Sequence, residues 1–165
     1  MKQILSVVFL FLSLFALSGC SGKNAELETP VNAYYCTSTV KYNTIDGVIK
    51  AELQDYHNYE GNLRGFLNQY LSGPKTVGLR SPFPLGGWIL RLEQTDKVID
   101  MTVTTNFARR APTDLTLSYA CISMTLFDLT DAETINIYIS NSDSDPLPHT
   151  ITRDSLILMD TTNPE

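Results

Sequence analysis

The sequence contains few of the side chains from which most enzymes build a reactive site. It has 2 histidines, 3 cysteines and 1 tryptophan, and only 18% of its residues are charged. Neither His57 nor His149 has a cysteine or a second histidine at metal-ligand spacing. The sequence also lacks the Gly-Xaa-Ser-Xaa-Gly elbow, the phosphate-binding P-loop and the dinucleotide fingerprint. We therefore expect a protein that is not an enzyme and needs no metal or cofactor.

Basic residues are outnumbered, with 12 Lys and Arg against 18 Asp and Glu, for a net charge of −6. Binding to nucleic acid draws its affinity mainly from cationic contacts with phosphate, so we expect no nucleic-acid partner. Arg109 and Arg110 form the only adjacent basic pair. This pair fits either a contact with an acidic partner or peptidoglycan, or a solvated turn.

No apolar run reaches the roughly 20 residues that a membrane-spanning helix needs. The run from Ile4 to Ala16 covers thirteen residues, follows Lys2 and fits the core of a signal peptide. Leu17-Ser18-Gly19-Cys20 comes directly after it and resembles a bacterial lipobox. The resemblance implies cleavage before Cys20 and acylation of that cysteine, as in lipid-anchored extracytoplasmic proteins; the alternative is an ordinary signal peptide with a coincidental cysteine.

Removing the signal peptide, residues 1–19, from the 165 residues leaves 146, which suits one domain. We expect a lipidated tether over 20–30 and a single domain over 31–160. Hydrophobic periodicity predicts two helices, at 63–71 and 113–129. Strands are expected at 31–40, 48–55, 134–140 and 156–159, with a strand hairpin over 88–107.

The order β-β-α-β-β-α-β predicts an α+β domain of two layers, with both helices packed on one largely antiparallel sheet. In the strand at 48–55 the apolar residues Ile49, Ala51 and Leu53 alternate with polar ones. We expect these three to face the core and the polar residues between them to face solvent.

The helix at 63–71 ends in Gly73-Pro74, and a short series of motifs follows it. These are the pair Gly78-Leu79, the run Ser81-Pro82-Phe83-Pro84, and the strand Val98-Ile99-Asp100-Met101-Thr102. Together they resemble the GerMN domain family of sporulation and spore germination proteins, over about residues 31–141. The sequence departs from that family at 126–129 and at 139–141. The resemblance implies a domain of the ring-building-motif type, whose role is protein–protein contact and which has no catalytic residues.

Residues 72–87 hold three prolines and four glycines, so no regular element is expected there. An irregular connection of this length is uncommon unless it is functional or packed on itself. One interpretation is a rigid interaction loop that presents Lys75, Leu79, Arg80, Pro82, Phe83 and Pro84. The other is a lid that turns Leu79, Phe83 and Leu85 toward the sheet.

Several other residues permit two interpretations. Cys36 and Cys121 fit either a disulfide or two small buried side chains. Glu93 and Asp100 fit either a pair of hydrolase carboxylates or two solvated strand residues. The aromatic residues fit either a platform for sugars or ordinary packing; they are Tyr34, Tyr35, Tyr56, Tyr59 and Trp88.

The function expected from the sequence is that of a lipid-anchored envelope protein that docks onto another envelope protein or onto copies of itself. The alternative is a lipoprotein that binds cell-wall glycan or another small ligand through its aromatic residues.

Overall fold

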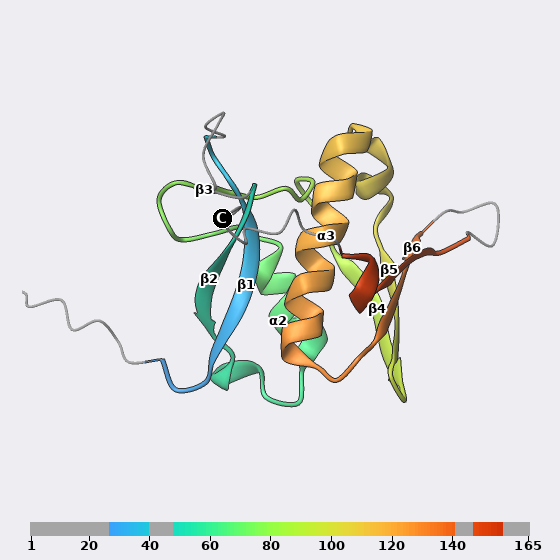
Figure 1. Cartoon of the computed structure of the whole chain (residues 1–165), viewed down its shortest axis with the longest axis horizontal. Helices are drawn as coiled ribbons and strands as arrows, with labels where there is room; N and C mark the ends of the chain where they lie inside the picture. The colour runs from blue at the N-terminus through green and yellow to red at the C-terminus, as the bar shows by residue number, and fades with distance from the viewer. Residues whose placement is uncertain (1–26, 40–47, 141–146, 157–165) are drawn as a thin grey trace, which may run out of the picture.

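The computed structural model describes residues 27–39, 48–140 and 147–156. The predicted signal peptide, Cys20 and residues 157–159 of the predicted last strand lie outside these ranges. Within them, two helices lie between two β-sheets (Figure 1).

The predicted α+β class and the order of its elements are confirmed. The helices are α2 (Leu63–Tyr70) and α3 (Pro112–Leu129), and three short 3-10 helices are η1 (His57–Tyr59), η2 (Thr105–Arg109) and η3 (Arg153–Ser155). The strands are β1 (Pro30–Thr37), β2 (Ile49–Asp55), β3 (Leu79–Arg80), β4 (Ile89–Thr95), β5 (Val98–Val103), β6 (Thr134–Ile139) and β7 (His149–Thr152). Strands β3 and β7 were not expected from the sequence.

The strands form two separate sheets instead of the one sheet that the sequence predicts. One has the order β2-β1-β3, and the other has the order β4-β5-β6-β7. All pairs are antiparallel except β5 and β6, which are parallel because α3 connects them.

The four-stranded sheet buries one face under the helices. Ile122 and Leu126 of α3 are fully buried, and the apolar side chains of β5 and β6 line the same core. These strand residues are Ile99, Met101, Val103, Ile135 and Ile137. Each large apolar side chain buried in this way contributes about 1.5–3 kcal/mol to the free energy of unfolding, so this core supplies much of the driving force for folding.

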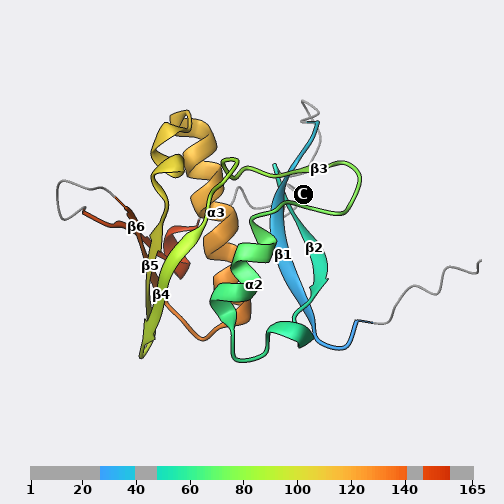
Figure 2. The same ribbon diagram turned by 180° about the vertical axis from the view of Figure 1, so that it is seen from behind.

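The three-stranded sheet contacts the helices through strand β1, at one edge of this strand. Asn32 Nδ2 and Tyr34 Oη donate hydrogen bonds of 3.0 Å and 2.8 Å to Asp128 Oδ2 of α3. On the opposite face of the strand, the centroid of the Tyr35 ring lies 4.9 Å from the centroid of the Tyr70 ring of α2. Strand β1 therefore contacts both helices, and Figures 1 and 2 show α2 and α3 between this strand and the four-stranded sheet.

At this edge, side chains of the helices replace the missing strand. The Tyr34 backbone N–H donates a 3.0 Å hydrogen bond to Thr125 Oγ1, and Tyr70 Oη donates a 2.6 Å bond to the Tyr34 carbonyl. Thr125 Oγ1 in turn donates to the carbonyl of Cys121, 2.9 Å away. Both backbone groups of Tyr34 are therefore satisfied without a neighbouring strand.

Helix α2 completes the edge of β4 in the same way. Asn68 Oδ1 accepts a 2.8 Å hydrogen bond from the Ile89 backbone N–H, and Asn68 Nδ2 donates to the Ile89 carbonyl at 3.3 Å. One amide side chain thus imitates a paired strand residue. Arg64 Nη1 adds a 3.0 Å bond to the carbonyl of Leu90.

We predict that Asn68→Ala lowers the free energy of unfolding by about 1–3 kcal/mol, because the backbone N–H of buried Ile89 loses its acceptor. Urea unfolding followed by circular dichroism measures the change. The control is Gln69→Ala, at an exposed position one residue further along α2, which should shift the free energy of unfolding by less than about 0.5 kcal/mol. Equal effects of the two substitutions would contradict the proposed capping of β4.

Candidate functional site

The connection between α2 and β4 divides into an exposed tip, a short strand and a buried segment. Residues 75–78 are exposed, and the Val77 side chain is 100% exposed. Leu79 and Arg80 form β3, which pairs with Cys36 and Thr37 of β1. The expectation that 72–87 contains no regular element is therefore wrong at these two residues. We call residues 75–80 the loop-tip site.

Glu52 of β2 holds the first half of the loop-tip site. Its Oε2 accepts hydrogen bonds from the backbone N–H groups of Lys75, at 2.9 Å, and Thr76, at 2.6 Å. Gln54 Nε2 donates to Glu52 Oε1 at 2.8 Å and to Tyr35 Oη at 2.9 Å. The carboxylate is therefore part of a hydrogen-bonded network that reaches from the loop to the core.

Ile49 of β2 packs against the core as predicted, but over residues 51–53 the buried face is the opposite of the predicted one. Glu52 is buried, whereas Leu53 is 62% exposed and Ala51 is also exposed. The expectation was wrong because the loop covers this face with backbone N–H groups, which need an acceptor and not an apolar side chain.

The environment of Glu52 favours its charged form. Burial by itself raises the pKa of a carboxyl group, but hydrogen bonds from Gln54, Thr76 and Lys75 together bring the pKa of Glu52 below its ordinary value. The negative charge is retained at neutral pH, and it strengthens the hydrogen bonds that hold the tip.

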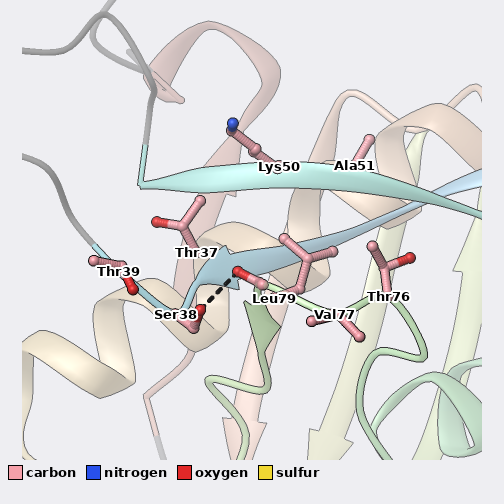
Figure 3. Close-up of a pocket in the computed structure, with 9 residues that line it drawn as sticks. Thr37, Ser38, Thr39, Lys50, Ala51, Thr76, Val77 and Leu79 are labelled. Atoms are coloured by element: carbon pink, nitrogen blue, oxygen red, sulfur yellow. Dashed lines mark hydrogen bonds between the residues drawn. The ribbon is translucent and has the colours of Figure 1, made fainter.

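Strand β1 holds the second half of the loop-tip site. The Gly78 carbonyl accepts hydrogen bonds from the Ser38 backbone N–H at 2.8 Å and from Ser38 Oγ at 2.9 Å, the latter drawn in Figure 3. Gly78 has φ +93°, a conformation that glycine adopts without strain. The tip is thus attached to β2 at its start and to β1 at its end.

A hollow of about 360 Å³ lies between this tip and the two strands (Figure 3). Its lining combines hydroxyl groups, aliphatic side chains and one lysine; the residues are Thr37, Ser38, Thr39, Lys50, Ala51, Thr76, Val77, Gly78 and Leu79. Among the described residues that line the hollow there is no carboxylate, histidine or cysteine.

The segment Pro82-Phe83-Pro84 is buried, so the interpretation that these residues are presented to a partner is wrong. Phe83 packs its ring 4.8 Å from the ring of Tyr70. The Pro82 carbonyl accepts hydrogen bonds from Ser118 Oγ at 2.6 Å and from Arg110 Nη2 at 3.2 Å.

The lid interpretation holds for Phe83 but fails for Leu85, which is 98% exposed. Neither interpretation of the loop is therefore complete. Lys75, Leu79 and Arg80 remain as candidate contacts at the surface, because Lys75 is exposed and the other two are half-buried.

The remaining motif residues have structural positions. Gly73, three residues after the end of α2, has φ +109°, and a side chain there would contact Ser81. Pro74 follows it and Ser81 Oγ accepts from the Phe83 backbone N–H at 3.2 Å. Asp100 is far along the chain, on the exposed face of β5, where its Oδ1 accepts a 2.9 Å hydrogen bond from Asn136. The structure does not bring Asp100 into the loop-tip site.

The other candidate groups do not form a reactive cluster in the part of the chain that the structure describes. Glu93 and Asp100 face each other across β4 and β5, both exposed, and Glu93 makes a 2.7 Å ion pair with Arg91. Among the described residues no group of three or more metal-ligating side chains comes together. Arg110 makes a 3.3 Å ion pair with Asp114 of α3.

The aromatic residues mostly pack inside the domain. Tyr35 is fully buried, and the rings of Tyr56 and Tyr59 lie 5.2 Å and 5.8 Å from the ring of Phe66. Trp88 is half-exposed. Residues 27–39, 48–140 and 147–156 include no helix that is both long and apolar enough to cross a membrane.

We predict that Glu52→Gln lowers the free energy of unfolding at pH 7 by about 1–3 kcal/mol, because the loop loses charge-assisted hydrogen bonds. The folded-state pKa of Glu52 lies below the unfolded one, so the carboxylate stabilises the fold above the unfolded pKa, and this contribution is lost as the pH falls through the folded pKa. Urea unfolding of both proteins from pH 7 to pH 3 should show their difference shrinking in acid. Glu133→Gln, at an exposed site, is the control and should leave the unfolding midpoint nearly unchanged.

The sequence matches no protein-family model and no curated protein. Among solved structures, it is similar to the tandem GerMN domains of the sporulation protein GerM from Bacillus subtilis, with a TM-score of 0.57 and 15% identity over 81% of this chain. The similarity covers 50% of that chain, so this chain spans about half its length. A protein from Clostridium perfringens described as a candidate lipoprotein gives a TM-score of 0.46 and 18% identity, over 76% of this chain and 89% of that one. From the first similarity we conclude that the chain has the GerMN-like α+β fold that its Gly-Pro and Ser-Pro motifs predict.

Proposed function

We propose that this chain is a lipid-anchored envelope protein whose domain docks, without catalysis, onto another envelope protein or onto a second copy of itself. The GerMN-like fold, which it shares with a sporulation protein, supports a place in an assembly of the sporulation or germination kind. The lipobox that ends at Cys20 supports the anchor.

The observation that carries this proposal is the loop-tip site. Val77 is an aliphatic side chain with no cover, although the backbone on either side of it is held by Glu52 and Ser38. A loop that is already fixed loses little conformational entropy when a partner binds. Lys75 beside the tip adds a positive charge, which suits a partner with an acidic residue next to an apolar one.

The glycan-binding alternative has less support. A sugar platform requires exposed aromatic faces side by side, whereas Tyr35 is buried and Tyr56 and Tyr59 pack on Phe66. Trp88 by itself does not form such a platform. We therefore propose no second function.

We predict that Val77→Asp, combined with Lys75→Glu, abolishes capture of the partner without unfolding the domain, because both side chains lie outside the core. The measurement is photo-crosslinking in intact membranes, followed by mass spectrometry of the captured proteins. A crosslink to a second copy of this chain identifies self-association, and a crosslink to another protein identifies a hetero-assembly.

The matched control is Leu147→Asp. Leu147 is 94% exposed like Val77, but it precedes β7 of the four-stranded sheet, whereas the loop tip adjoins the three-stranded sheet. Its substitution should leave every crosslink in place. If the tip variant folds and keeps all the crosslinks of the parent protein, the proposed role of the loop-tip site is wrong.

We also predict that Cys20→Ser abolishes lipid attachment. Cells are grown with an alkyne-labelled fatty acid, and the isolated chain is examined for the label. The parent chain and the neighbouring variant Ser21→Ala should carry it, because Ser21 lies after the bond that is cut. Label that persists in Cys20→Ser would show that another site carries the lipid.

A further inference from the structure

Two buried thiols face each other where α3 crosses β1. Cys36 and Cys121 are both free and both 0% exposed. Each thiol is close enough to the other to shift its pKa, that of Cys36 downward and that of Cys121 upward. Cys36 pairs through its backbone with Arg80 of the loop-tip site, but both side chains are buried away from the surface proposed for docking, so the proximity of the two thiols requires a separate explanation.

The register between β1 and α3 independently brings these residues together. Tyr34 contacts Thr125, as the hydrogen bond between them shows. Cys36 follows Tyr34 by two residues, which is about 6.6 Å along the strand. Cys121 precedes Thr125 by four residues, which is about 6 Å along the helix. The strand and the helix run in opposite directions, so both steps lead to the same place.

We infer that Cys36 and Cys121 form a structural disulfide when this chain folds in an oxidising compartment. The bond would connect residues 121 − 36 = 85 positions apart and fasten β1 to α3. A crosslink that closes so long a loop strongly restricts the unfolded chain and thereby stabilises the fold. An exported protein, as the signal sequence predicts, meets such an oxidising compartment.

The reaction requires an external disulfide as oxidant. A thiolate of the chain attacks that disulfide and forms a mixed disulfide, which the second cysteine then resolves. One sulfur–sulfur bond of the oxidant breaks and one forms in the protein. The two cysteines lose two electrons, and their two protons pass to the two small thiols that are released. Because both side chains are inaccessible in the folded domain, the first attack precedes the docking of α3 on β1.

The test uses the full-length chain in detergent, reduced and unfolded in urea, and then refolded in a mixture of reduced and oxidised glutathione. Free thiols are blocked with N-ethylmaleimide, and the chain is cut with trypsin without reductant. We expect the peptide 24–41, which contains Cys36, to be joined to the peptide 111–153, which contains Cys121. Dithiothreitol should lower the midpoint of thermal unfolding by roughly 10 °C.

The double variant Cys36→Ala/Cys121→Ala is the control, and its unfolding midpoint should not respond to dithiothreitol. Maleimide on both Cys36 and Cys121 after oxidative refolding to a native circular dichroism spectrum would overturn the inference. A peptide that joins either residue to Cys20 would overturn it as well. So would a linked chain whose unfolding midpoint is the same with and without reductant.

Discussion

The domain depends on completing the part of the β1 edge that β3 does not pair with. This part of the edge lies against the two helices, and a buried backbone group without a partner costs about 1–3 kcal/mol. Tyr70 and Thr125 supply the missing partners from α2 and α3, each through a hydroxyl group at the end of a side chain. The position of Tyr70 on α2 and that of Thr125 on α3 therefore determine where β1 lies against the two helices.

This constraint explains why the strands form two sheets. Helices replace a neighbouring strand at the inner edge of β1 and again at β4, where Asn68 bonds both backbone groups of Ile89. Neither edge remains open for the other sheet. The same requirement explains why α3 buries the polar residues Ser118 and Thr125. Ser118 donates a hydrogen bond to the carbonyl of Pro82, and Thr125 accepts one from the backbone N–H of Tyr34. The core is thus organised by hydrogen bonds at its strand edges as well as by apolar contact.

The same principle connects the core with the surface that we propose as the docking site. A carboxylate buried at Glu52 accepts backbone N–H groups of the loop, and through Gln54 it is linked to Tyr35, beside the edge of β1. Val77 is consequently exposed on a backbone that is fixed on both sides. A loop attached in this way presents one conformation to a partner, whereas a loop held only by its ends would have to be ordered on binding.

The sequence by itself determined the α+β class, the two helices and most strand positions, because periodicity and Gly-Pro signals depend on neighbouring residues only. Its Gly-Pro and Ser-Pro motifs also predicted the GerMN-like fold. Only the tertiary structure decided which side of β2 is buried, where Pro82, Phe83 and Pro84 point, and that Asn68 belongs to a strand edge. Each of these depends on a backbone group from a distant segment that needs a hydrogen-bond partner, and the position of such a group is set by the packing of the whole chain and not by the residues beside it.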